Sequence, residues 1–142
     1  MNTDLNIAIL IPCYNEAIAI SDVVNQFKKI LPTSAIYVYD NNSTDNTADI
    51  AKSVCALVRE EKNKGKGNVV RRMFADIEAD IYLLIDGDNT YDINQAPDLI
   101  NALITEQCDM VVGNRVEVIQ DNKYKIYRPG HRLGNAFFGT VI

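Results

Sequence analysis

The most informative feature of the sequence is a pair of acids placed directly after an apolar run. Residues 83–85 (Leu-Leu-Ile) lead into Asp86, Gly87 and Asp88. A buried strand with this ending presents both carboxylates at its C-terminal end, where open α/β sheets bind their ligands. Mg²⁺ and Mn²⁺ bind carboxylate oxygens and commonly share them with substrate phosphates. The pattern therefore predicts a divalent-metal site on Asp86 and Asp88, and a solvated Asp-Gly turn is the alternative interpretation.

The first predicted strand also ends in residues that could bind a nucleotide. Pro12 stops strand pairing because it has no N–H, and Tyr14 follows with a ring that can stack on a nucleobase. Glu16 can accept a hydrogen bond from a ribose or a base. The alternative is that Asn15 and Glu16 simply open the next helix, since acids favour a helix N-terminus.

The second predicted strand ends in Asp40, and short polar residues follow it at 41–47. An acid in this place is a natural acceptor for a ribose hydroxyl or a base N–H, so Asp40 is predicted to contact the ligand. We expect residues 44–47 to form an Asx-rich turn in which Asp45 caps the following helix.

A basic, glycine-rich segment at 63–67 (Asn-Lys-Gly-Lys-Gly) lies between the third predicted strand and the third predicted helix. Glycines let the backbone approach a ligand closely, and a helix N-terminus attracts anions. Lys66, and Arg71 one turn later, are therefore candidate nucleotide contacts. The segment is not a Walker A loop, because neither Ser nor Thr follows its Gly-Lys pair. A solvated basic turn is the alternative.

Alternating strands and helices must position these segments. Short runs rich in Ile, Leu, Val and Tyr predict strands at 6–12, 35–40, 56–60, 80–86 and 109–114. Helical spacing predicts helices at 20–31, 47–54, 67–78 and 95–106. Regular alternation of the two gives a parallel sheet with right-handed crossovers. The predicted fold class is therefore α/β, with a Rossmann-like, mostly parallel sheet flanked by helices.

Composition restricts the possible functions. The 142 residues suffice for one domain with a sizeable core, and the formal net charge of -5 argues against nucleic-acid binding. Three scattered cysteines without a CxxC pair predict neither a zinc site nor a disulfide framework. We therefore expect the cysteines to be small, buried hydrophobic residues. No run reaches membrane-spanning length. The apolar end at 136–142 nevertheless predicts that the chain is cut, or that this end meets a membrane or another copy.

Five motifs together resemble glycosyltransferase family 2, the nucleotide-diphospho-sugar transferases of GT-A fold. They are Ile-Pro-Cys-Tyr-Asn-Glu at 11–16, Asp-Asn-Asn-Ser-Thr-Asp-Asn-Thr at 40–47, Gly-Lys-Gly at 65–67, Asp-Gly-Asp at 86–88 and Gly-Asn-Arg at 113–115. Their order and spacing cover nearly the whole chain. Two details look most like the polyprenyl-phosphate sugar synthases of the dolichyl-phosphate mannose synthase type. These are Asp-Gly-Asp-Asn-Thr-Tyr-Asp at 86–92 and His-Arg-Leu-Gly-Asn at 131–135.

The resemblance implies a role for each matching residue. Those that would form or border the nucleotide pocket are Pro12, Tyr14, Glu16, Asp40, Lys66 and Arg71. Asp86 would hold the ribose or the metal, and Asp88 would be the main ligand of a catalytic Mg²⁺ or Mn²⁺. Arg115, with His131 or Arg132, would receive the acceptor's phosphate, because the planar Arg fork matches phosphate oxygens. A surface ion pair is the alternative for Arg115, and a helix cap is the alternative for His131.

The chain also departs from the family. Members usually have a longer catalytic domain, and those that glycosylate a hydroxyl have a catalytic-base acid beyond the region covered here. One explanation is that residues 1–142 are the nucleotide-binding portion of a single truncated catalytic domain. The other is an acceptor that needs no base. A phosphate monoester loses its second proton near pH ~6, whereas a hydroxyl needs a general base.

The expected function is metal-dependent, inverting transfer of a hexose from UDP- or GDP-hexose to a polyprenyl phosphate. This would occur in the cytoplasm, at the inner membrane face. The alternatives are a non-catalytic nucleotide-sugar-binding fragment and a transferase that acts on a hydroxyl of a cell-surface glycan. A sugar-phosphate nucleotidyltransferase is disfavoured because residues 12–16 are not a Gly-rich basic loop. A phosphoryl-accepting receiver domain is disfavoured because it would need an acidic pair where only Glu16 stands.

Overall fold

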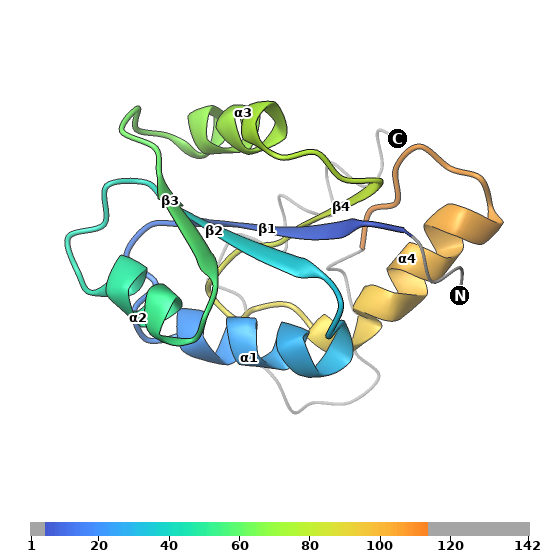
Figure 1. Cartoon of the computed structure of the whole chain (residues 1–142), viewed down its shortest axis with the longest axis horizontal. Coiled ribbons are helices and arrows are strands. Elements are labelled where there is room, and N and C mark those ends of the chain that lie inside the picture. Colours follow the sequence, from blue (N-terminus) through green and yellow to red (C-terminus); the bar gives the residue numbers. More distant parts are fainter. Residues whose placement is uncertain (1–4, 114–142) are drawn as a thin grey trace, which may run out of the picture. The chain divides into compact units, whose positions relative to one another are not determined.

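The computed structural model describes residues 5–113 (Figure 1). Its packing divides the chain into two compact units, Met1–Val111 and Val112–Ile142. Every helix and strand named below belongs to the first unit. The predictions that fall outside the described residues are those for Asn114, Arg115, His131, Arg132 and the apolar end at 136–142.

The described residues form one sheet of four parallel strands in the order β3-β2-β1-β4. The strands are β1 (Ile7–Cys13), β2 (Ala35–Asp40), β3 (Leu57–Glu60) and β4 (Ile81–Leu84). β1 is central, and its last residue Cys13 pairs with Asp40 of β2. On its other side β1 pairs with β4 as far as Leu10 and Leu84. Because the strands are parallel, the polar segments that follow them meet at one edge of the sheet.

Helices cover both faces of the sheet. They are α1 (Ile20–Ile30), α2 (Thr47–Ser53), α3 (Lys66–Asp76) and α4 (Ala96–Thr105), with a 3-10 turn η1 (Ile93–Gln95) before α4. Figure 1 shows α1 and α2 on one side of the sheet and α3 on the other. The two faces of β1 therefore lie in different core clusters. Ile9 and Ile11 pack in the cluster of α1 and α2, whereas Ala8 and Leu10 pack in the cluster of α3.

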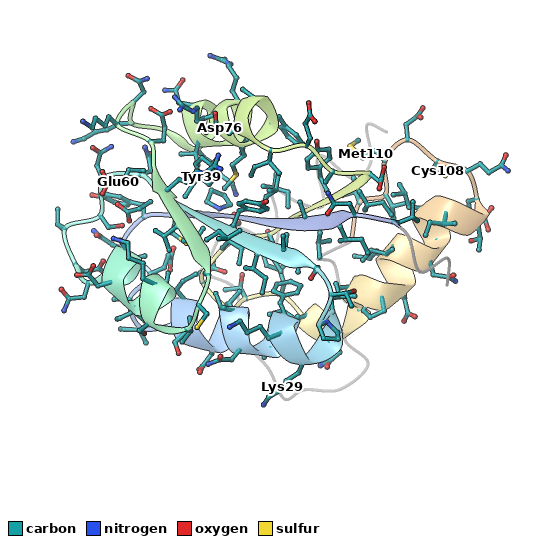
Figure 2. The ribbon with its side chains drawn as sticks, in the orientation of Figure 1. Lys29, Tyr39, Glu60, Asp76, Cys108 and Met110 are labelled. Atoms are coloured by element: carbon teal, nitrogen blue, oxygen red, sulfur yellow. The ribbon has the colours of Figure 1, made fainter. Side chains whose placement is uncertain are left out.

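The amphipathic pattern of the first helix is confirmed. Ile20, Val23, Val24 and Phe27 recur at helical spacing and are all buried in α1. Lys29, near the end of the same helix, points away from the sheet (Figure 2). The predicted parallel sheet is confirmed as well, with element ends that differ from the predicted ones by a few residues.

The fifth predicted strand, at 109–114, is wrong over its described part. Residues 109–113 form no strand, and Met110 and Val112 are 76% and 74% exposed. A strand forms only where its N–H and C=O groups find a neighbouring edge. Within the described residues, no strand of the sheet pairs with this segment. The apolar composition that predicts a strand does not supply such a partner.

The expectation that all three cysteines are buried holds only for Cys13. Cys55 is exposed in the turn after α2, where its φ is 58°. Cys108 is exposed just beyond α4 (Figure 2). Turns at helix ends face solvent, so a small apolar side chain there is not drawn into the core. In residues 5–113 no helix has both the length and the apolar character needed to cross a membrane.

Candidate functional site

A cavity of about 240 Å³ lies at the carboxyl ends of β1 and β4. Its lining consists of Pro12, Cys13, Tyr14, Glu16, Asn41, Lys66, Val69, Asp86 and Asp88. Both predicted metal ligands are among these residues, together with four of the predicted nucleotide contacts. The structure thus brings together side chains from three separate loops and from the first turn of α3.

Hydrogen bonds hold the loop after β1 against the loop after β2. Asn15 N–H donates to Ser43 Oγ over 2.9 Å, and Thr44 N–H donates to Asn15 Oδ1 over 2.8 Å. Glu16 N–H donates to Thr47 Oγ1, also over 2.9 Å. Asn15 has a φ of 55°, which Asn tolerates better than most residues. These bonds fix the cavity wall that follows β1.

The predicted helix cap differs in detail. The N-cap of α2 is Asn46 rather than Asp45. Asp45 Oδ1 nevertheless accepts the N–H of Thr47 over 3.0 Å, and its Oδ2 accepts the N–H of Ala17 over 3.2 Å. The Thr47 hydroxyl, which also donates to Asp45, is the main reason that the pKa of this carboxyl is lowered. Asp45 therefore joins two loops and also accepts a backbone N–H from the first turn of the helix.

The two predicted metal ligands already have partners within the chain. Lys66 Nζ forms an ion pair with Asp86 Oδ1, and Tyr91 Oη donates to Asp86 Oδ2 over 3.1 Å. Asp88 Oδ1 accepts from the N–H and the hydroxyl of Thr90 over 3.1 and 2.7 Å. These contacts fix the orientation of both carboxylates at the cavity.

Negative charge is concentrated in the cavity. The pKa of Glu16 is raised, first by burial and then by repulsion from Asp88, Asp86 and Asp45. A cavity with this charge excess suits a cation. In residues 5–113, however, no three His, Cys, Asp or Glu side chains are grouped so that they could hold a metal ion. Asp86 and Asp88 alone would leave most positions around Mg²⁺ or Mn²⁺ to substrate phosphates and water, and their role as metal ligands stays a prediction.

The backbone between the two acids passes very close to β1. A Cβ placed on Gly87 would lie 2.7 Å from Cys13 Sγ, so glycine is required there. Burial, followed by the charge of Glu16 and of nearby aspartates, raises the pKa of the Cys13 thiol. Cys13 is therefore a neutral packing residue of the cavity floor and not a nucleophile.

Two predicted nucleotide contacts do not line the cavity. Asp40 is 7% exposed; its Oδ2 accepts from Ser43 N–H over 3.1 Å, and its buried Oδ1 has no hydrogen-bond partner. Arg71 is exposed on α3. Their roles stay predictions, as do the roles of Arg115, His131 and Arg132, which lie outside residues 5–113.

The sequence analysis missed Asn41, which lines the cavity. Residues 41–47 have the composition of a turn, and turn formation alone can explain why they are polar. No local pattern marks Asn41, because it follows the last residue of β2 and its side-chain partners Glu61, Asn63 and Gly65 lie about 20 residues further along the chain.

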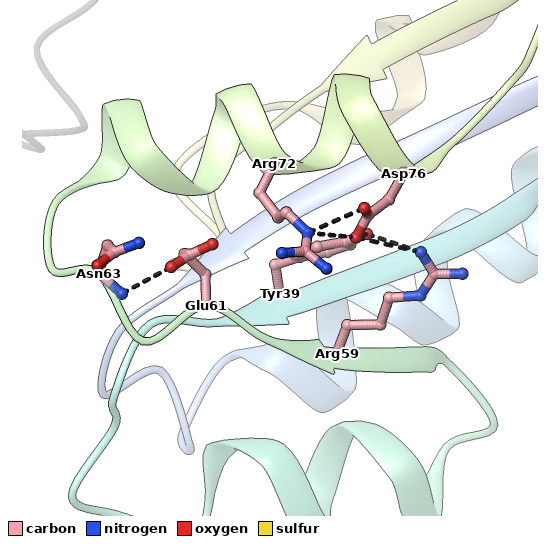
Figure 3. Close-up of polar contacts among 6 residues, drawn as sticks. All are labelled: Tyr39, Arg59, Glu61, Asn63, Arg72 and Asp76. Atoms are coloured by element: carbon pink, nitrogen blue, oxygen red, sulfur yellow. Dashed lines mark hydrogen bonds and ion pairs between the residues drawn. The ribbon is translucent and has the colours of Figure 1, made fainter.

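A second polar cluster joins α3 to the sheet (Figure 3). Tyr39 Oη donates to Asp76 Oδ2 over 3.0 Å and accepts from Arg59 Nη1 over 3.1 Å. Arg72 Nε donates to both carboxylate oxygens of Asp76, over 2.9 and 2.8 Å. Arg72 is the main reason that the pKa of Asp76 is lowered. This cluster is structural: it fixes the end of α3 that lies away from the cavity.

Comparison with known proteins agrees with this fold. The model of the family Glycosyl transferase family 2 matches residues 8–140. Protein RfbJ of Shigella flexneri is 57% identical over 93% of this chain and 100% of its own length. A dolichyl-phosphate hexose transferase of Haloferax volcanii is 26% identical over 96% of this chain and 61% of its own.

A solved structure supports the fold. Glucosyl-3-phosphoglycerate synthase of Mycobacterium tuberculosis, in complex with Mn²⁺, UDP-glucose and phosphoglyceric acid, superposes with a TM-score of 0.59 at 25% identity. The match covers 75% of this chain and 40% of the synthase. This chain therefore spans less than two thirds of the hexose transferase and of the synthase, although it spans all of RfbJ. From its motifs, its sheet and these relatives, the chain belongs to glycosyl transferase family 2.

Proposed function

We propose that residues 1–142 are the nucleotide-binding portion of an inverting, metal-dependent glycosyltransferase. It would transfer a hexose from a UDP- or GDP-hexose to a polyprenyl phosphate. The observation that carries this proposal is the convergence of Asp86, Asp88, Lys66 and Tyr14 on one cavity at the carboxyl edge of the sheet. The two carboxylates can bind a metal ion, the lysine ammonium can bind a phosphate, and the tyrosine ring can stack on a nucleobase.

The donor's base and ribose would be bound near the ends of β1 and β2. The ring of Tyr14 is 56% exposed and free to stack on a nucleobase. The buried Oδ1 of Asp40 lacks a hydrogen-bond partner, and a base N–H would supply one. Such a contact offsets the desolvation of a buried polar atom. Uracil and guanine both have an N–H that could make this contact.

The diphosphate would lie between Lys66 and the two aspartates. Asp86 and Asp88 would hold Mg²⁺ or Mn²⁺, which when bound offsets the charge that grows on the departing nucleoside diphosphate. Lys66 would donate to the phosphate oxygens from the first turn of α3, where a helix N-terminus also favours anions. Glu16 would orient the ribose by accepting from a hydroxyl.

We favour a lipid phosphate as the acceptor over a sugar hydroxyl, because a hydroxyl would need a general base. The phosphate of a polyprenyl phosphate is ionised near neutral pH and needs no general base. The acceptor's phosphate would contact Arg115 and His131 or Arg132, and the reaction would take place at the cytoplasmic membrane face. The name of the dolichyl-phosphate hexose transferase relative supports this acceptor class.

Thermal-shift binding of UDP, GDP and their hexose conjugates, with and without Mn²⁺, tests the donor site. A ligand at a hundred times its Kd adds roughly 2.7 kcal/mol of stability. A Mn²⁺-dependent shift with one nucleotide is the expected result, and Asp88→Asn should abolish the Mn²⁺ dependence. No shift with any nucleotide would contradict the proposal.

Transfer of radiolabelled hexose to a short polyprenyl phosphate tests the acceptor. Binding without transfer to any acceptor would favour the non-catalytic fragment. Transfer to a glycan hydroxyl, with none to the lipid phosphate, would favour the alternative acceptor class.

A further inference from the structure

The side-chain amide of Asn41 makes its hydrogen bonds to one loop, the segment from Glu61 to Gly65. Its Nδ2 donates to the carbonyl oxygens of Glu61 and Asn63 over 2.7 and 2.9 Å, and its Oδ1 accepts from Gly65 N–H over 2.8 Å. Both donor hydrogens and one acceptor site are thereby occupied. The orientation of the amide is fixed, because a flipped amide would place its NH₂ group against the N–H of Gly65. Asn41 therefore has little hydrogen-bonding capacity left for a ligand, although it lines the cavity.

The loop that Asn41 holds leads directly into α3. Gly65 is the N-cap of this helix and has a φ of 115°, which side-chain-bearing residues rarely adopt. Lys66 is the first helical residue, and its Nζ pairs with Asp86 across the cavity. The loop closes on itself as well, because Glu61 Oε1 accepts from Asn63 N–H over 2.6 Å (Figure 3). The position of Lys66 thus depends on where Asn41 fixes Gly65.

We propose that Asn41 is a positioning residue for donor binding. It fixes the segment from Glu61 to Gly65 at the end of β2, so that Lys66 starts α3 facing Asp86 and can receive the diphosphate. This inference rests on the proposed function, and it assigns to Asn41 an effect exerted through Lys66 rather than by contact with the nucleotide.

A double-mutant cycle tests this by isothermal titration calorimetry with UDP and GDP in Mn²⁺. Asn41→Ala and Lys66→Ala should each weaken binding of the preferred nucleotide about tenfold, which is roughly 1.4 kcal/mol. If Asn41 acts through Lys66, the double variant should bind no more weakly than Lys66→Ala alone. A double variant weakened about a hundredfold would overturn the proposal, because the two residues would then act independently. Unchanged binding by Asn41→Ala would also overturn it.

Two further variants separate positioning from general loop stability. Asn41→Asp keeps the size and the acceptor for Gly65 but removes both donors, so it should weaken binding as Asn41→Ala does. Asn42 donates to Glu61 O and Lys62 O over 3.2 and 3.0 Å from a φ of 63°. Asn42→Gly removes those bonds without strain and should leave affinity unchanged. An equal loss in Asn42→Gly would overturn the specific role of Asn41.

Hydrogen exchange gives a readout that needs no nucleotide. The Gly65 amide should lose protection in Asn41→Ala and keep it in Asn42→Gly and Lys66→Ala; unchanged protection in Asn41→Ala would overturn the proposed contact. A wild-type chain that binds neither nucleotide would overturn the proposed function and this inference with it. Nucleotide binding by the wild type, with additive effects in the cycle, would overturn the inference alone.

Discussion

At Gly87 the backbone lies so close to β1 that no side chain fits. A Cβ there would be 2.7 Å from Cys13 Sγ and 3.4 Å from Ile11 Cγ2. Gly87→Ala should therefore lower the free energy of unfolding by about 1–3 kcal/mol, the usual cost of overpacking. Urea unfolding followed by circular dichroism measures the change.

Gly67→Ala is the matched control. Nothing lies within 4 Å of a Cβ at Gly67, which is a residue of α3. Alanine should stabilise this position by up to ~1 kcal/mol, because it favours the helix and restricts the unfolded chain. A Gly87→Ala variant as stable as the wild type would contradict the packing argument.

The raised pKa of Glu16 predicts a pH-dependent stability. Burial and the charges of Asp88 and Asp86 disfavour its ionised form in the folded chain. Its ionisation therefore costs stability above the raised pKa, and that cost disappears as the pH falls below the ordinary value of 4.5. Glu16→Gln should be more stable than the wild type at pH 7.5, and the difference should shrink towards pH 4.5.

Urea midpoints of both proteins across this pH range check the Glu16 prediction. The comparison of the two chains cancels the titration of those groups that the charge of Glu16 does not influence. A stability difference that stays constant with pH would show that the ionisation of Glu16 carries no such cost.

At the scale of the elements, the cluster of Tyr39, Arg59, Arg72 and Asp76 holds α3 on the sheet. Tyr39→Phe removes one donor and one acceptor from this cluster. It should lower the free energy of unfolding by about 1 kcal/mol, the typical net worth of a hydrogen bond. The lowered pKa of Asp76 means that its contribution is present above pH 3.8 and is lost as the pH falls through the depressed value. The cost of Tyr39→Phe at pH 7, measured by urea unfolding, should therefore shrink in acid.

The alternation of elements was predictable because local patterns specify it. The buried stripe of α1 has a helical period and β1 is a continuous apolar run, and both are confirmed. The strand predicted at 109–114 fails because its formation depends on a partner edge, which the local sequence does not encode. The local sequence likewise did not reveal that Asp45 also accepts from Ala17, 28 residues earlier in the chain.

The cavity was predictable to the extent that its residues follow strand ends. Asp86, Asp88 and Tyr14 each come directly after an apolar run, and the parallel sheet brings them together. Asn41 escaped because its partners Glu61, Asn63 and Gly65 are about 20 residues further along the chain. Long-range hydrogen bonds of this kind have no periodic signature.

At the scale of the whole molecule, the two core clusters seen within residues 5–113 are built from the sheet, the helices on its two faces and the 3-10 turn before α4. A chain ended at Gly113 should therefore keep its fold and unfold cooperatively, because it retains every residue of these two clusters. It should also keep nucleotide-dependent stabilisation and lose transfer to a phosphate acceptor. Far-UV circular dichroism and thermal shifts check the first two outcomes, and a fragment without a cooperative transition would contradict them.

The unequal surroundings of the three cysteines have a practical consequence. Cys13 is buried, and its raised pKa keeps the thiol neutral and unreactive. Cys55 and Cys108 are exposed beyond the ends of α2 and α4. Maleimide reagents should therefore modify two thiols per chain and leave the cavity untouched. A pair of spin labels or dyes introduced in this way would measure movement between α2 and α4 during donor binding, with no substitution in the sequence.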